Sequence, residues 1–172
     1  MAIDITTMLI NLDQSVPGLM SLVTGASVLT GFWFALRGVY QMRVYGELRT
    51  MTSMQTNLAG PLAYLFVGIA LIYWPSMVDS AMLTVFNTSS PLAYQASGMG
   101  GDYDLTIQAC GDIIKLIGFI AFVRGLVLLT KHGQQQQGGS NTAKAIAHLL
   151  GGILAINIYA TWEIVKNTLG LG

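Results

Sequence analysis

Charge is what this chain has least of. Only 9% of its 172 residues are charged, whereas a soluble domain usually carries about 25%. Hydrophobic residues make up 53% of the chain, and the mean hydropathy is +0.59. A soluble fold needs a charged exterior, and this chain has too few charged residues to make one. The composition therefore predicts an integral membrane protein.

Other residue types are scarce as well, and each scarcity removes a class of function. The single cysteine, Cys110, cannot form an internal disulfide. The net charge is zero and no basic tract is present, so we expect no direct binding of nucleic acid, which needs clustered Lys and Arg. The two histidines, His132 and His148, have no Cys or carboxylate cluster at ligand spacing. No nucleophile elbow and no phosphate-binding glycine loop occurs. The sequence predicts no enzyme, no metal site and no cofactor.

What the chain does contain is a pair of similar apolar segments. Residues 31–46 read GFWFALRGVYQMRVYG, and residues 118–133, eighty-seven positions later, read GFIAFVRGLVLLTKHG. After a polar stretch, each copy is followed by a second apolar run with a shared phrase: Ala63-Tyr64-Leu65 with Gly68, and Ala147-His148-Leu149 with Gly152. A fixed self-similarity sets the unit of a fold. We interpret the unit as an apolar hairpin that is used twice.

The lengths of the apolar runs predict an all-α integral membrane protein in a single domain, 1–172. Four runs are each long enough to cross a bilayer, which needs about 20 residues. Residues before Pro17–Gly18 are apolar only at helical spacing, which is typical of a short amphipathic helix in the membrane interface. Pro75 predicts a kink in the second span. The expected segments are the interfacial helix 1–16, the first hairpin 17–86, an extracytoplasmic loop 87–106 and the second hairpin 107–172.

The distribution of charge predicts the orientation. Basic residues of short loops stay in the cytoplasm, and here they gather in and beside the two polar hairpin linkers, 41–60 and 131–143. Both linkers should therefore be cytoplasmic, with both termini outside. The N-terminus carries acids and no Lys or Arg, so we expect no cleaved leader.

Glycines predict where helices pack. In the third span Gly111, Gly118 and Gly125 recur every seven residues, and the fourth span offers Gly151 and Gly152. Small residues let membrane helices approach closely enough for dispersion forces to hold them. We favour helix packing, within the chain or between copies, over an ion path beside bare backbone.

Two groups of charged residues have alternative interpretations. Asp112 and Lys115 stand three apart on one helix, which favours a local interfacial ion pair over a proton or ion relay. Arg37 and Arg124 match in the repeat, so we expect both at the same depth. Snorkelling to the headgroups is the simpler interpretation for them, and contact with lipid phosphate or a partner's carboxylates is the alternative.

Several phrases resemble the IcmC/DotE family. They are the opening MAIDI, FALRGVYQMRVYGELRTM, GPLAYLFVGIALIYWPSM, and FVRGLVLLTKHGQQQQGG followed by AKAIAHLLGGILAINI. The similarity covers nearly the whole chain, and the YGELR and KHGQQQQGG segments are its most distinctive parts. Members are small inner-membrane components of type IVB (Dot/Icm) secretion systems, similar to TraR proteins of I-type conjugation. The resemblance implies a bacterial inner-membrane subunit beside DotA/TraY-like and DotP/TraQ-like partners, with no active site.

Three functions remain open from the sequence. The first is a structural or pore-lining subunit of such an export machine, forming homo- or hetero-oligomers in contact with membrane lipids. The second is a small independent ion channel or transporter that uses Asp112 and Lys115. The third is a pilin-like subunit that is extracted from the membrane into a filament.

Overall fold

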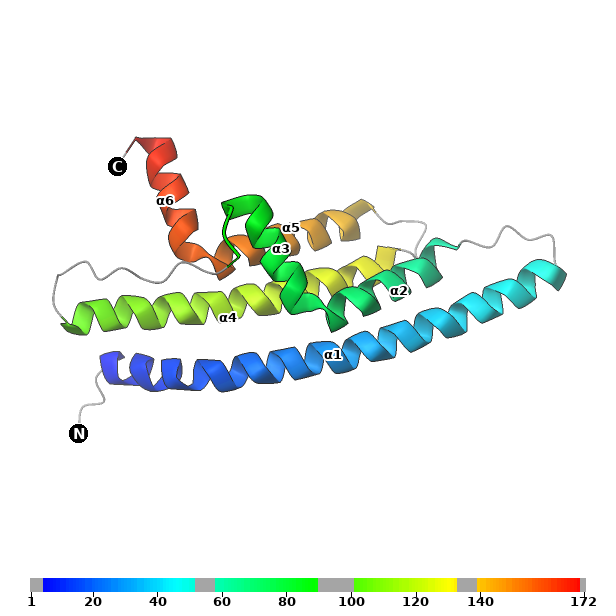
Figure 1. Ribbon diagram of the computed structural model, residues 1–172, viewed down its shortest axis with the longest axis horizontal. Helices are drawn as coiled ribbons and strands as arrows, with labels where there is room; N and C mark the ends of the chain where they lie inside the picture. The colour runs from blue at the N-terminus through cyan, green and yellow to red at the C-terminus, as the bar shows by residue number, and fades with distance from the viewer. Residues whose placement is uncertain (1–4, 52–57, 90–100, 133–138, 171–172) are drawn as a thin grey trace.

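The computed structural model describes residues 5–51, 58–89, 101–132 and 139–170. Within these ranges the regular structure is α-helical (Figure 1), as the composition predicted. The helices are α1 (Ile5–Met51), α2 (Ala59–Ile72), α3 (Trp74–Phe86), α4 (Gly101–His132), α5 (Gly139–Ile156) and α6 (Ile158–Leu169).

The helices form two hairpins that lie side by side (Figure 1). In the first, α1 packs against α2, and in the second, α4 packs against α5. The second helix of each hairpin then bends sharply: α3 leaves α2 at 87°, and α6 leaves α5 at 94°. Both bent segments project to the same side of the molecule (Figure 1).

Two helices of the described chain are long and apolar enough to cross a membrane. Their apolar stretches are Thr7–Leu48 and Asp104–Lys131, and the number rises to four if each bent pair counts as one span. With a rise of about 1.5 Å per residue, α1 is about 70 Å long and α4 about 48 Å. Both exceed the hydrocarbon thickness of about 30 Å. These helices have the length and composition of a membrane protein.

The expected break at Pro17–Gly18 is wrong. α1 continues through Pro17 as one helix of 47 residues, so residues 5–16 extend the first long helix and do not form a separate interfacial helix. Proline removes one N–H from the helix, but only one bond is lost among the many that flank it. Such a loss is tolerated in membrane helices.

The polar segments are also more helical than expected. α1 continues to Met51 through much of the expected linker 41–60, and α5 begins at Gly139, inside the expected linker 131–143. An ion pair one turn apart supports the end of α1, since Arg43 Nε lies 3.0 Å from Glu47 Oε1. α4 begins at Gly101, inside the expected loop 87–106, and Asp104 near its start interacts favourably with the helix dipole. Residues 90–100 of that loop lie outside the described residues.

The kink expected near Pro75 is present, but a proline is not required for a bend of this kind. α2 ends at Ile72, and Tyr73 separates it from α3, where Pro75 lies in the first turn. The second hairpin has an unexpected break at Asn157, with a similar angle and no proline near it. Tyr73 and Asn157 are eighty-four residues apart, the same spacing as Gly68 and Gly152. The bend is therefore a property of the repeated unit.

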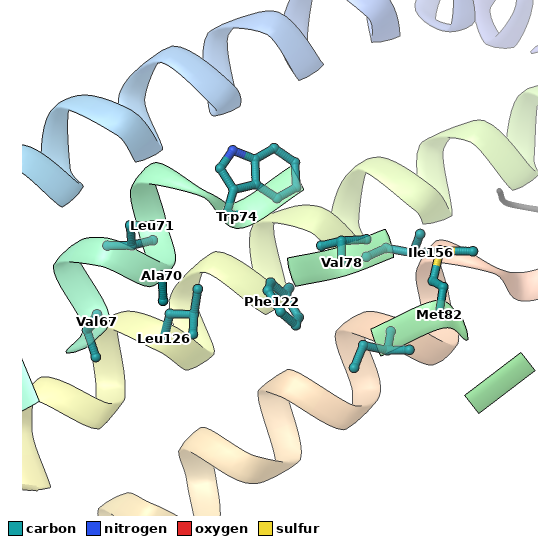
Figure 2. Packing of buried hydrophobic residues seen from close by; sticks show 10 residues of the cluster. Val67, Ala70, Leu71, Trp74, Val78, Met82, Phe122, Leu126 and Ile156 are labelled. Carbon is teal, nitrogen blue, oxygen red and sulfur yellow. The ribbon is translucent and has the colours of Figure 1, made fainter. Parts of the chain in front are cut away.

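A core of buried apolar side chains joins the two hairpins (Figure 2). The ring of Trp74 packs edge-on against Phe119 of α4, with the ring centres 5.1 Å apart. Because the bend turns α3 across the second hairpin, residues from α2, α3, α4 and α5 meet in one cluster. The buried members are Val67, Ala70, Leu71, Trp74, Val78, Met82, Phe122, Leu126, Ile153 and Ile156.

The two hairpins are displaced along the helix axis. Asp112 of α4 meets Asp13 of α1, although its counterpart in the repeat is Gly25. Met20 of α1 and Phe119 of α4 line one pocket together with residues of α3, and these two residues are also ninety-nine positions apart. α1 and α4 therefore run parallel, with the copies offset by twelve residues, about 18 Å of helix.

Candidate functional site

Two glycines bring the helices of the second hairpin into close backbone contact. A Cβ atom built on Gly118 would lie 2.8 Å from the backbone nitrogen of Ile156 and 2.9 Å from the carbonyl oxygen of Gly152. A Cβ on Gly152 would lie 2.9 Å from the carbonyl oxygen of Gly118. Backbone atoms cannot turn aside as a flexible side chain can. The approach of α4 to α5 therefore requires glycine on both helices.

The first hairpin makes the same contacts with matching residues. A Cβ on Gly31 would lie 2.8 Å from the carbonyl oxygen of Gly68, and one on Gly68 would lie 2.6 Å from the backbone nitrogen of Ala35. The next contact is also shared: a Cβ on Gly38 would meet Leu65, as one on Gly125 would meet Leu149. Gly31, Gly38 and Gly68 mark the repeat in the sequence, but the predicted packing positions did not include them. Their match to Gly118 and Gly125 was the signal that could have added them.

Gly111 and Gly151 differ from the other predicted packing glycines. A Cβ on Gly111 would collide with the hydroxyl and ring of Tyr159, so this glycine faces α6. Gly151 has no described atom within 4 Å of such a Cβ. Successive helical residues point about 100° apart, so Gly151 and its neighbour Gly152 cannot both face α4. Gly151 is therefore not part of the packing within the chain, and its contact with another copy stays a prediction.

A polar cluster joins three helices near the beginning of α4. Lys115 Nζ lies 2.7 Å from Asp112 Oδ1, which agrees with the expected local pair. The structure adds the carboxyl group of Asp13 from α1, which lies close to Asp112 and Lys115. It also adds the ring of Tyr159 from α6, whose centre lies 5.5 Å from Lys115 Nζ. The tyrosine hydroxyl donates to the carbonyl oxygen of Ile107, at 3.4 Å.

Sequence reasoning missed two members of this cluster. Asp13 is ninety-nine residues from Asp112, and Tyr159 carries no motif. The repeat gave no signal either, because the axial displacement brings α4 beside residues of α1 that are not its counterparts.

The two matched arginines have different surroundings. The guanidinium carbon of Arg37 lies 5.2 Å from the centre of the Tyr64 ring, within the range of a cation–π contact. Arg124 makes no ion pair or ring contact with any described residue. The expectation that both arginines lie at the same depth is wrong, because the displacement of the hairpins moves Arg37 about 18 Å further along the helix axis.

Groups suited to metal binding do not assemble in the part of the chain that the structure describes. No three His, Cys, Asp or Glu side chains come close enough there to hold a metal ion. His148 Nδ1 lies 2.8 Å from the carbonyl oxygen of Lys144 and, since a carbonyl only accepts, donates to it. The expectations of no metal, no cofactor and no enzyme stay predictions.

Comparison with known proteins finds no family model, no curated protein and no solved structure that matches this chain.

Proposed function

We propose that this chain is a non-enzymatic structural or pore-associated subunit of a type IVB secretion or conjugation apparatus in the bacterial inner membrane, and that it assembles by helix packing. One observation carries the assembly role: the hairpins are closed internally by glycine contacts, while a long apolar face of α1 stays exposed. The resemblance of FALRGVYQMRVYGELRTM and KHGQQQQGG to IcmC/DotE proteins supports the apparatus.

The proposed membrane placement follows from the charges of α4. From Asp112 to Lys131 the helix rises about 28 Å, close to the hydrocarbon thickness of about 30 Å. α2 and α5 then enter from the linker side, and the nearly right-angled bends turn α3 and α6 across the bundle axis, beside the half of α4 that begins at Asp112. α3 suits this position, because Ser76, Asp79 and Ser80 are exposed while its other face is buried. In this placement the bent pairs α2–α3 and α5–α6 each count as one broken span. The linkers lie in the cytoplasm and both termini lie in the periplasm.

The face of α1 that points away from the hairpins is the proposed contact with lipid and with other subunits. It runs from Gly18 to Tyr40, about 33 Å of helix, and it exposes five large apolar side chains over this length. Asn11 and Glu47 lie beyond its two ends on the same face. The exposed apolar residues are Leu22, Leu29, Trp33, Leu36 and Tyr40.

A crosslinking experiment tests this role. A photoreactive amino acid at Leu29, which is 73% exposed, should form crosslinks in intact cells to a second copy or to another subunit of the apparatus. The same amino acid at Leu71, which is fully buried, should crosslink only within the chain. Crosslinks at Leu29 to lipid alone would contradict assembly through α1. Crosslinks to proteins unrelated to export would contradict the apparatus but not the assembly.

Ion translocation is the second candidate, because the Asp13–Asp112–Lys115 cluster joins three helices. Buried or half-buried charges in a membrane protein often mark ion pathways. Purified protein in liposomes should then conduct protons or cations, and Asp112→Asn should abolish the flux. Asp79→Asn is the matched control, since Asp79 is exposed on α3. Flux that is absent in the unaltered protein would eliminate this candidate.

A further inference from the structure

A shallow pocket of about 420 Å³ lies on the outer surface of α1. Its lining consists of Trp33, Leu36, Arg37, Tyr40 and Gln41. All five belong to one helix, and all except Gln41 are exposed, so the pocket opens away from the bundle. It combines one cation with aromatic and aliphatic side chains.

The cation is held in place by a buried aromatic platform. Arg37 lies over the ring of Tyr64, which is only 6% exposed. Tyr64 in turn packs edge-on against Phe34, with ring centres 5.5 Å apart. No carboxylate within the described chain forms an ion pair with Arg37. The guanidinium is thus oriented by Tyr64, and no carboxylate among the described residues neutralises its charge.

The second copy of the repeat lacks this arrangement. Around Arg124, Ile120 and Val127 stand where the first copy has its two exposed aromatic residues, and His148 replaces the tyrosine platform. The His148 ring is engaged with the carbonyl oxygen of Lys144. The two arginines therefore have the same place in the repeat and different chemistry around them.

We propose that Arg37 and its pocket bind the phosphate of an anionic phospholipid, and that Arg124 does not. A guanidinium offers paired N–H donors that match phosphate oxygens. Trp33 and Tyr40 are of the residue types that lie at the level of lipid headgroups, while Leu36 provides an apolar contact for the start of an acyl chain. The axial displacement puts Arg37 nearer the linker end of the bundle than Arg124. This inference rests on the proposed membrane placement but not on the secretion role.

Quenching of tryptophan fluorescence by brominated lipids tests the site. The full chain is placed in vesicles of phosphatidylcholine that contain either brominated phosphatidylglycerol or brominated phosphatidylcholine. The signal of Trp33 is the part of the fluorescence that Trp33→Phe removes. Phosphatidylglycerol should quench this part about fivefold more effectively, the factor expected for one cation near an anionic lipid surface. Arg37→Gln should abolish the preference, and Arg124→Gln should leave it unchanged.

Four further observations decide the inference. Equal quenching of Trp33 by the two lipids in the unaltered protein would overturn it, as would equal loss in Arg37→Gln and Arg124→Gln. Inorganic phosphate in excess should not reduce the preference; displacement by phosphate would identify a free-anion site and overturn the lipid assignment. Arg37→Lys, which keeps the charge, should retain part of the preference and the helical circular dichroism. If it loses the preference while folded, the paired donors are required, and if it retains all of it, the match to phosphate geometry is wrong.

Discussion

Gly118 and Gly152 face each other so closely that a Cβ atom on either one would lie 2.9 Å from the carbonyl oxygen of the other. Gly31 and Gly68 have the same relationship in the first hairpin, at 2.8 and 2.9 Å. The repeat detected in the sequence is therefore a repeat of contacts between two backbones. In both hairpins a bend follows the second glycine by five residues, at Tyr73 and Asn157.

Gly118→Leu should lower the free energy of unfolding by roughly 1–3 kcal/mol or more, because overpacking a tight contact forces backbone shifts. Thermal unfolding in detergent, followed by circular dichroism, measures the change. Gly25→Leu is the matched control, since Gly25 lies in the other long helix and a Cβ added to it would meet no described atom within 4 Å. A Gly118 variant as stable as the Gly25 variant would show that the α4–α5 contact does not support the fold.

Gly111→Ala should also destabilise the protein, by about 1–3 kcal/mol, but through a side chain. The added methyl group meets the Tyr159 ring and hydroxyl, and the ring can be removed by mutation. In a double-mutant cycle, Tyr159→Leu should suppress most of the cost, with a coupling of about 0.5–3 kcal/mol. Strictly additive effects would contradict the contact between α4 and α6.

The two carboxylates of the polar cluster should respond in opposite directions to loss of charge. Asp112→Asn removes the charged partner of Lys115 and should cost about 1.5–3 kcal/mol, as for a hydrogen bond to a charged group. Asp13→Asn should be neutral or stabilising, because its amide can donate to ionised Asp112 without a shared proton. Unfolding in mixed micelles of rising denaturing-detergent fraction measures both. Equal destabilisation by the two variants would argue against this arrangement.

Pro75→Ala should leave the bend between α2 and α3 intact, because α5 and α6 bend by 94° without a proline. Spin labels at Leu62 and Leu83, both exposed, report the angle by pulsed electron resonance. The two backbone positions should stay about 22 Å apart, against about 32 Å for a straight helix of the same length. A shift toward the longer distance would assign the bend to the proline.

The parallel arrangement of α1 and α4 predicts which residues share a side of the membrane. In a Cys110→Ser background, single cysteines replace Asn11, Gly46 or Lys131, and intact cells are treated with an impermeant thiol reagent. With the linkers in the cytoplasm, Asn11→Cys should be labelled, while Gly46→Cys and Lys131→Cys should react only after lysis. Labelling of Gly46→Cys and Lys131→Cys on different sides would contradict the parallel pairing itself.

Composition and spacing were enough to predict part of this architecture. The shortage of charge and the apolar runs predicted an all-helical chain with segments able to cross a membrane, because those properties are local sums over residues. The matching phrases around Gly31 and Gly118 located the repeat. The pairing of Asp112 with Lys115 also followed from the sequence, since residues three apart on a helix are neighbours.

Only the tertiary structure decided how the two copies meet. Pro17 does not end α1, because a single lost hydrogen bond is small beside a helix of 47 residues. Nothing in the chain encodes locally that the hairpins are offset by twelve residues. At this offset Trp74, at the start of α3, packs edge-on against Phe119 of α4. The offset brings Asp13 beside Asp112 and places Arg37 and Arg124 at different heights along the bundle. Packing between distant segments sets this register, whereas the spacing of residues within one segment does not.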